Sequence, residues 1–171
     1  MIIRPFQDKI KFENAILDFL TRLLIDFRNL YNIELENYEL DHICWRSTSD
    51  DDYRLLESYL LGYGELYHKN IHNGRPISLI LLNDPVVYEN RIIELIELPS
   101  PKMGTPYETG FEHAEFVIDT PIDEFVIKHQ DLPWDTRNIG RPINPDVKLP
   151  VGKSKVKFHT STLAHVVKNL E

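Results

Sequence analysis

The sequence predicts an α+β fold of two modules in the order βαβββ, with a long helix before the first module and a short helix after the second. The prediction rests on the segments 38–47 and 111–118, which both read as strands. In each, an acidic residue precedes a histidine, an apolar residue follows it, and an aromatic residue stands two positions later. A helical pattern and further strand-like runs follow each segment. This repetition indicates a duplicated unit that holds one shared site.

We predict that residues 1–171 form a single domain that opens with an amphipathic helix at 8–32. Apolar residues recur there at steps of three and four. A stripe this wide needs a large partner, so we expect the helix to pack on a sheet. The proline-rich segment 100–109 breaks regular structure, because proline cannot donate to a strand ladder. We therefore place a linker there, between a first module at 37–99 and a second at 110–171.

In the first module, local signals predict the elements that follow the first strand. Ser or Asp at 49–50 is the expected N-cap of a helix over 50–63. Asn-Gly at 73–74 is a strong signal for the turn of a β-hairpin. A second turn is expected at 83–85, where Asn-Asp-Pro precedes a long strand over 86–98.

The second module repeats this order less clearly. Its expected elements are the strand 111–118, a helix over 121–130, strands near 137–140, 147–151 and 155–160, and a last helix from Ser161 to Leu170. Asp119 or Thr120 is the expected cap of the first of these helices. Within the strand 111–118, alternation puts His113 and Glu115 on one face.

Composition argues against several classes of protein. With a formal net charge of −8, the surface repels a phosphate backbone, so we expect no nucleic-acid partner. The single cysteine, Cys44, excludes an internal disulfide and fits a reducing compartment. No apolar run is long enough to span a bilayer, and the first residues lack the order of a signal peptide. We therefore expect a cytoplasmic protein without a membrane partner.

Histidines at matching places in the two modules indicate a metal site. His42 lies in the first strand of the first module, His113 in the first strand of the second, and His159 at the end of the last strand. A metal site needs several imidazole or carboxylate groups that converge, and strands deliver such groups from rigid elements. One histidine in a strand is usually structural, but recurrence in both modules makes metal ligation an equal alternative.

Three carboxylates are candidates for the same site. Glu94 and Glu97 lie in the last strand of the first module, and their odd spacing puts them on opposite faces. Periodicity alone does not choose between them. Glu115 shares the face of His113 and would act as a general base if burial raised its pKa.

Several short pieces of the chain, in their order, resemble the YecM family of small bacterial proteins. These pieces are Asp41-His42-Ile43 with Arg46, Asn73-Gly74-Arg75-Pro76-Ile77, Glu97-Leu98-Pro99, Glu112-His113-Ala114-Glu115 and Lys157-Phe158-His159. That family is similar in fold to the vicinal-oxygen-chelate superfamily, which includes glyoxalase I, extradiol dioxygenases, epimerases and fosfomycin-resistance proteins. The resemblance implies two βαβββ modules that close around a cavity with a metal site.

The resemblance also implies a set of ligands. Superfamily enzymes draw them from the first and last strands of each module, which by position are His42, Glu97, His113 and His159. It therefore favours Glu97 over Glu94. His159 departs from the superfamily, where a carboxylate commonly stands on the final strand. Three imidazoles and one carboxylate suit iron, zinc, nickel or manganese.

Three cations are expected to line the same cavity as substrate-binding groups. Arg46 and Lys157 alternate with histidines of the implied ligand set, and Arg75 follows the hairpin turn. Cations beside a metal ion can hold a carboxylate or a phosphate. The structural alternative is that Arg46 and Glu115 pair across the sheet.

We expect a divalent-metal-dependent enzyme that acts on a small anionic molecule by lyase, isomerase or oxygenase chemistry. Its metal would polarise adjacent oxygens of the substrate. The alternative is a non-catalytic protein that binds a small ligand with the same fold and without a required metal. A third possibility is a scaffold that docks a partner through its first helix. The residues do not indicate an oligomeric state.

Overall fold

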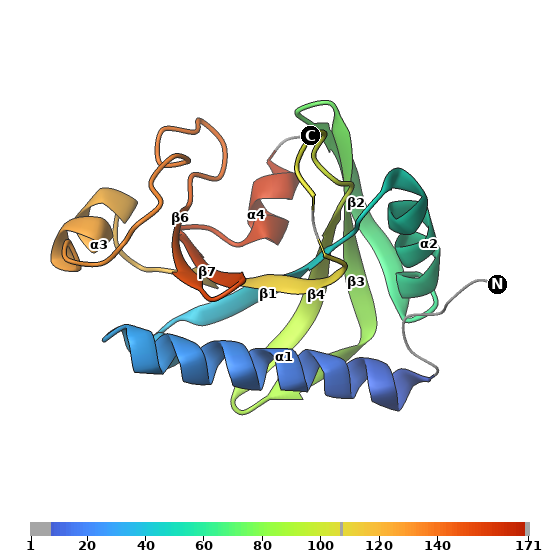
Figure 1. The fold of residues 1–171 in the computed structure, drawn as a ribbon, viewed down its shortest axis with the longest axis horizontal. Helices are drawn as coiled ribbons and strands as arrows, with labels where there is room; N and C mark the ends of the chain where they lie inside the picture. The colour runs from blue at the N-terminus through green and yellow to red at the C-terminus, as the bar shows by residue number, and fades with distance from the viewer. Residues whose placement is uncertain (1–7, 107, 170–171) are drawn as a thin grey trace. The chain divides into compact units, whose positions relative to one another are not determined.

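The computed structural model describes residues 8–106 and 108–169. Its elements are α1 (Lys9–Leu30), the 3-10 helix η1 (Leu35–Asn37), β1 (Glu39–Arg46), α2 (Asp50–Leu60), β2 (Gly64–His72), β3 (Arg75–Tyr88), β4 (Arg91–Pro99), β5 (Gly110–Val117), α3 (Ile122–Lys128), β6 (Val147–Val151), β7 (Ser154–His159) and α4 (Leu163–Lys168) (Figure 1). Two predictions fall outside the described residues. They are the absence of a signal peptide, as far as it concerns residues 1–7, and the end of the last helix at Leu170.

The chain divides into two compact units. The first comprises the described residues up to Leu20 together with Ile43–Glu112. The second comprises Thr21–His42 together with the described residues from His113 onward. Helix α1 and strands β1 and β5 therefore contribute residues to both units. The fold is α+β, as predicted, and strands, helices and further strands follow one another along the chain in each half.

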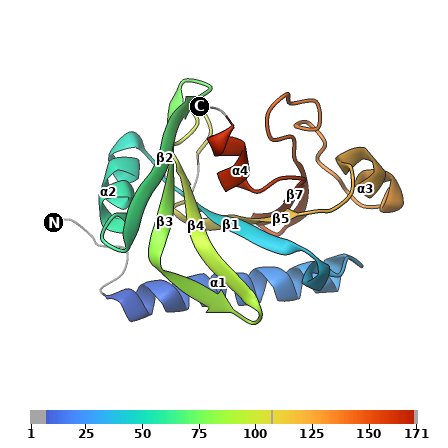
Figure 2. The ribbon, with the colours of Figure 1, turned by 180° about the vertical axis from the view of Figure 1, so that it is seen from behind.

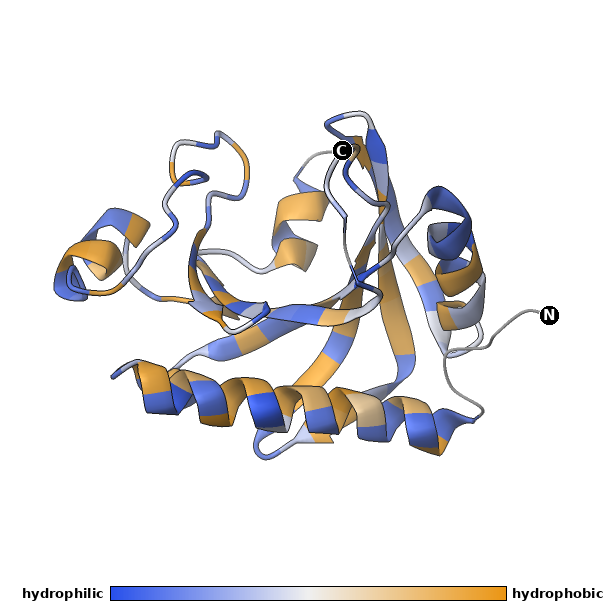
Figure 3. Cartoon of the chain, in the orientation of Figure 1, coloured by the Kyte–Doolittle hydropathy of each residue, from blue (hydrophilic) through white to orange (hydrophobic). Residues whose placement is uncertain are grey.

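Helix α1 confirms the predicted long first helix. Figure 3 shows hydrophobic and hydrophilic residues alternating along it. In the first unit Phe12 stacks on Tyr63 with ring centroids 4.8 Å apart, and in the second unit Phe27 packs against Phe158 at 6.2 Å. Each unit thus builds an aromatic core on its own part of the helix. Among the described residues, no helix combines the length and the apolar character needed to cross a membrane.

The sheet of the first unit has the strand order β2-β3-β4-β1. Figure 2 shows β2, β3 and β4 next to one another, with α2 alongside. The first three strands are antiparallel, whereas β1 runs parallel to β4, with Cys44 opposite Glu97. The predicted hairpin is confirmed, because Asn73 and Gly74 have φ values of 51° and 76°. Positive φ at both positions is what a two-residue type I′ turn requires.

The turn expected at 83–85 is wrong. Strand β3 continues through this segment to Tyr88, and its pairing with β4 shifts register between Leu81 and Val86. An irregularity of this kind accommodates the proline of the segment, which has no N–H to donate to the ladder. The chain turns instead at 89–90, where the first residue has a φ of 55°.

Helix α2 begins where the sequence predicts, because the Ser49 hydroxyl accepts a backbone N–H of the first turn at 3.1 Å. Its buried side holds a polar contact, in which Tyr53 Oη lies 2.6 Å from Ser78 Oγ on β3. At its edge, Lys69 Nζ on β2 donates to Glu57 at 2.8 Å. These contacts attach the helix to both strands of the hairpin.

The sheet of the second unit has the order β5-β7-β6, with β5 parallel and β6 antiparallel to β7. The strand expected at 137–140 is wrong. These residues form a turn, and pairing in the segment is a single bridge between Asp135 and Lys148. Gly140 and Pro142 explain the difference, because both residue types favour turns over regular pairing.

The two short helices begin differently from the expectation. Pro121 occupies the N-cap position of α3 without a side-chain hydrogen bond, so neither Asp119 nor Thr120 caps that helix. Helix α4 is capped by Thr162, whose hydroxyl accepts a backbone N–H at 3.2 Å, rather than by Ser161.

The alternation predicted for β5 is present in the second unit. Phe116 packs toward the aromatic core, 6.3 Å from Phe158 between ring centroids. The opposite side of the sheet, which we term the polar face, carries His113, Glu115, Lys157, His159 and Lys148. His113, Glu115 and His159 are buried despite their polarity. Buried polar groups of this kind need partners or a function.

Candidate metal centre

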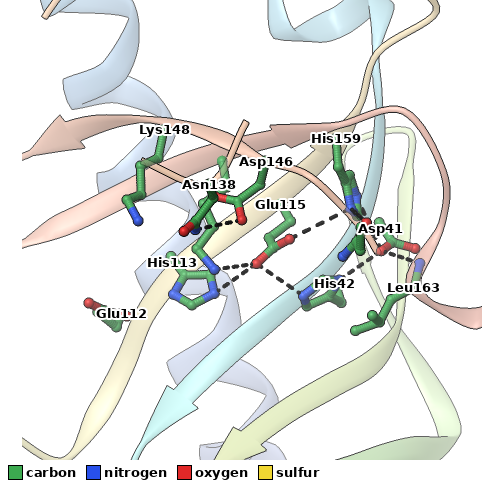
Figure 4. Close-up of polar contacts among 12 residues, drawn as sticks. Asp41, His42, Glu112, His113, Glu115, Asn138, Asp146, Lys148, His159 and Leu163 are labelled. Carbon is green, nitrogen blue, oxygen red and sulfur yellow. Dashed lines mark hydrogen bonds and ion pairs between the residues drawn. The ribbon is translucent and has the colours of Figure 1, made fainter. Parts of the chain in front are cut away.

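The carboxylate of Glu115 lies among imidazoles on the polar face (Figure 4). Its Oε1 is 3.1 Å from His113 Nε2 and 3.5 Å from His42 Nε2, and the three side chains are at most 5% exposed. Each residue offers a ligand atom, and these atoms lie within 4.8 Å of one another. His42 and His113 thus lie together, as a shared site requires. Two imidazoles and a carboxylate form a donor set that fits a divalent ion.

Asp41 orients His42. Its Oδ2 is 2.7 Å from His42 Nδ1 and also accepts the backbone N–H of Leu163 at 2.9 Å. A carboxylate at this distance favours the tautomer with hydrogen on Nδ1, which leaves the lone pair of Nε2 directed toward Glu115. Ligand histidines of metal sites commonly donate their second N–H to a carboxylate in this way.

His159, which the resemblance implies as a ligand, lies next to this group. Its Nδ1 is 3.2 Å from Asn144 Oδ1 and 3.7 Å from Glu115 Oε2, and its Nε2 is 3.4 Å from Asp41 Oδ2. Burial lowers the pKa of His159, although Glu115 and Asp41 oppose this effect. In the second unit, the ligand atoms that lie within 4.8 Å of one another belong to His42, His113 and Glu115, and His159 is not among these residues.

From the sequence, we expected Glu115 to act as a general base only if burial raised its pKa, and the pKa of Glu115 is not raised. Burial by itself raises the pKa of Glu115, but Lys157, whose Nζ is 2.6 Å away, holds that pKa well below its ordinary value. A carboxylate with a lowered pKa is a weak proton acceptor and stays charged. It is therefore better suited to bind a cation than to remove a proton.

Each cation that was expected to hold an anion has a partner inside its own unit. Lys157 contacts the carboxylate described above. In the first unit, Arg46 Nε donates to Glu112 Oε2 at 2.7 Å, and both side chains are nearly buried. Arg75 Nη1 donates to the backbone carbonyl of Ser100 at 2.6 Å. To bind an anion, as predicted, each cation would have to give up its present partner or contact the anion and that partner together.

The two glutamates of β4 differ in exposure. Glu94 is exposed, whereas Glu97 is half-buried and stands opposite Cys44 of β1. This difference agrees with the preference for Glu97, because a metal ligand must leave bulk water. Glu97 belongs to the first unit while His42 and His113 belong to the second. Its ligation therefore stays a prediction.

The sequence did not reveal the roles of Asp41 and Asn144. Neighbouring residues of a strand point to opposite faces, so an acid directly before a histidine is not expected to reach its imidazole. In the structure, however, the Asp41 carboxylate does contact the His42 imidazole. The acid directly before the histidine was the sequence signal that could have indicated this contact. Asn144 lies in an irregular segment with a φ of 45°, where periodicity gives no guide.

A family model described as YecM protein matches residues 8–169. The chain belongs to the YecM family. An uncharacterized protein of Haemophilus influenzae (strain ATCC 51907 / DSM 11121 / KW20 / Rd) is 34% identical over 141 residues, which cover 78% of this chain and 74% of that protein. Protein YecM of Escherichia coli (strain K12) is 30% identical over 122 residues, which cover 61% of this chain and 63% of that protein.

Solved structures place the YecM fold among known folds. The structural-genomics protein EC4020 matches with a TM-score of 0.78 and 25% identity, over 96% of this chain and 94% of its own. A variant of Streptomyces coelicolor methylmalonyl-CoA epimerase, in complex with 2-nitronate-propionyl-CoA, matches with a TM-score of 0.51 and 18% identity, over 72% and 96%. The YecM chain therefore shares its fold with this epimerase, which agrees with the fold that the resemblance implied.

Proposed function

We propose that this protein binds a divalent metal ion through His42, His113 and Glu115 and uses it to act on a small anionic molecule. The observation that supports the proposal most is the convergence of these three buried groups within 4.8 Å. Such a set suits zinc, iron, nickel or manganese, and the residue types do not choose among them. Glu97 and His159 are proposed as further ligands on the basis of the family resemblance.

The proposed chemistry is that of a lyase, isomerase or oxygenase. A bound metal ion would polarise adjacent oxygens of the substrate and stabilise an enolate. The chain itself prepares the site in two ways. Asp41 keeps a hydrogen on Nδ1 of His42, and Lys157 keeps Glu115 ionised. All three proposed ligands are buried, so a metal ion that they held would be shielded from bulk water.

Metal analysis of protein purified without a histidine tag tests the proposal. We expect about one divalent ion per chain, or binding of one ion when metal-free protein is titrated with zinc, nickel, manganese or iron(II). If none of the four ions binds, the proposed metal-dependent function is wrong.

One observation favours a second candidate function, binding of a small ligand without metal. Lys157 Nζ lies 2.6 Å from Glu115 Oε1, so this carboxylate has a compensating charge in the absence of a metal ion. A protein of this class would be stabilised by its ligand in excess chelator. The metal-dependent protein would lose that stabilisation when its ion is removed.

Replacing Asp41 by asparagine is expected to weaken metal binding about 10- to 100-fold without loss of the fold, because an uncharged partner no longer holds His42 in the ligating tautomer. Calorimetric titration of the metal-free variant with zinc measures the change. Asp123→Asn, in an exposed position of α3, is the matched control and should bind as the wild type does. An unchanged affinity in Asp41→Asn would mean that Asp41 does not support a metal ligand.

A further inference from the structure

Two lysines are neighbours on the polar face of the second unit. Glu115 of β5 is in register with Lys157 of β7, and Lys157 is in register with Lys148 of β6. The bridge between Lys148 and Asp135 continues the row. Residues directly opposite in adjacent strands share a face of the sheet. The row therefore places two ammonium groups between two carboxylates, and it begins at a proposed metal ligand.

The two lysines have unequal partners. Lys157 Nζ lies 2.6 Å from Glu115 Oε1, whereas Lys148 Nζ lies 3.5 Å from Asp135 Oδ2. Asp135 is already held by Arg137, which donates to both of its oxygens at 2.9 and 2.6 Å. Within the ranges that the structure describes, the ammonium of Lys148 makes no hydrogen bond. Its charge is thus balanced less directly than that of its neighbour.

Burial makes this imbalance costly for Lys148. Its side chain is only 16% exposed. Burial lowers its pKa, Asp146 and Asp135 oppose the change, and Lys157 and Lys155 add to it. An ammonium in such a place is stabilised by any anion that comes within hydrogen-bond distance.

Asp146 does not supply that anion by direct contact. Its Oδ2 accepts a hydrogen bond from Asn138 at 2.8 Å (Figure 4) and lies 3.6 Å from Arg141 Nη1. Its Oδ1 is buried and has no hydrogen-bond partner among the residues described. This part of the second unit therefore holds a half-buried cation and, on Asp146, a buried acceptor oxygen whose hydrogen-bonding capacity is not used.

We propose that Lys148 binds the second acidic group of a small dianionic molecule whose other end binds the metal ion. The inference rests on the proposed function at His42, His113 and Glu115. Adjacent strands are about 4.8 Å apart, so the backbones at Lys148 and Glu115 are separated by roughly 10 Å. Two long side chains shorten this span, and a hydroxy- or oxodicarboxylate of roughly four or five carbons bridges the rest. A monocarboxylate reaches the metal alone.

Malate and lactate test the inference, because they share the hydroxy-acid end and differ in the second carboxylate. Their binding to the manganese-loaded full chain and to the metal-free chain is measured by calorimetry. We expect malate to bind the loaded wild type about tenfold or more tightly than lactate does. Lys148→Met should remove this preference and leave lactate and manganese binding unchanged, and its melting temperature should not fall below that of the wild type. Lys148→Arg should restore part of the preference.

Lys128→Met is the matched control, since it removes one positive charge from an exposed position of α3. If manganese binds and Lys148→Met keeps the preference for malate, the inference about Lys148 is overturned and the metal site stands. If neither manganese nor zinc, nickel or iron(II) binds but the metal-free wild type binds malate through Lys148, the anion site stands and the metal proposal fails. If malate binding never depends on Lys148, with or without metal, the inference is overturned.

Discussion

Replacing His113 by alanine is expected to abolish tight binding of zinc or nickel. Its imidazole is fully buried, and Nε2 lies 3.1 Å from Glu115 Oε1, so no surface residue can take its place. Loss of a partner that only supports a ligand already lowers metal affinity about 10- to 100-fold. Loss of the ligand itself should therefore exceed about 100-fold. Calorimetric titration of the metal-free variant measures the change, with circular dichroism to confirm that the variant is folded.

Two control variants make this result specific. His68→Ala removes an imidazole from β2 in the first unit, and Glu94→Ala removes an exposed carboxylate of β4. Both should bind zinc as the wild type does. Wild-type affinity in folded His113→Ala would rule out the proposed centre. Loss of binding in Glu94→Ala together with retention in Glu97→Ala would reverse the preference between these two glutamates.

Replacing Lys157 by methionine is expected to lower the free energy of unfolding of the metal-free protein by about 3–5 kcal/mol, because it leaves a buried carboxylate without its nearest cation. Urea denaturation measures the loss. The double variant Lys157→Met/Glu115→Gln should recover most of it, since it removes the uncompensated charge as well. A loss below about 1 kcal/mol in the single variant would show that the histidines alone compensate Glu115.

The same ion pair gives stability a defined pH dependence. Lys157 holds the pKa of Glu115 well below its ordinary value in the folded protein. In the unfolded chain a glutamate titrates near ~4.3. The stabilising contribution is therefore complete above that pH and is lost as the pH falls through the lower folded pKa. Glu115→Gln should accordingly lose less stability than the wild type between roughly pH 5 and the acid transition.

Local signals predicted those parts of the fold that depend on local chemistry. Asn73-Gly74 forms the predicted hairpin, and Ser49 caps α2, because turn conformation and capping involve only neighbouring residues. The turn predicted at 83–85 was wrong because strand pairing there overrides the local preference. Its residues favour a turn, but the pairing of β3 with β4 extends past it, and pairing across strands is not visible in a local pattern.

The candidate site shows the same limit. Alternation placed His113 and Glu115 on one face, and the structure brings them to 3.1 Å. The contact of Lys157 with Glu115 depends on the register of β5 and β7, which no sequence period encodes. Lys148 was part of an expected strand without a role, because its place in the row follows from register as well. Alternation of hydrophobic and polar residues thus predicts which face of a strand a side chain lies on. Which side chains contact one another across strands depends on the register of strand pairing.

The second unit joins Thr21–His42 to residues from His113 onward, and this affects the order of events during synthesis. A ribosome releases His42 long before the strands that carry His113 and Lys157. The proposed ligand group therefore cannot assemble on a nascent chain until β5 has emerged, and the core around Phe27 waits for β7. Contacts between such distant segments also slow folding compared with local ones. Under the proposed function, a metal ion could therefore be bound only after β5 has been synthesised.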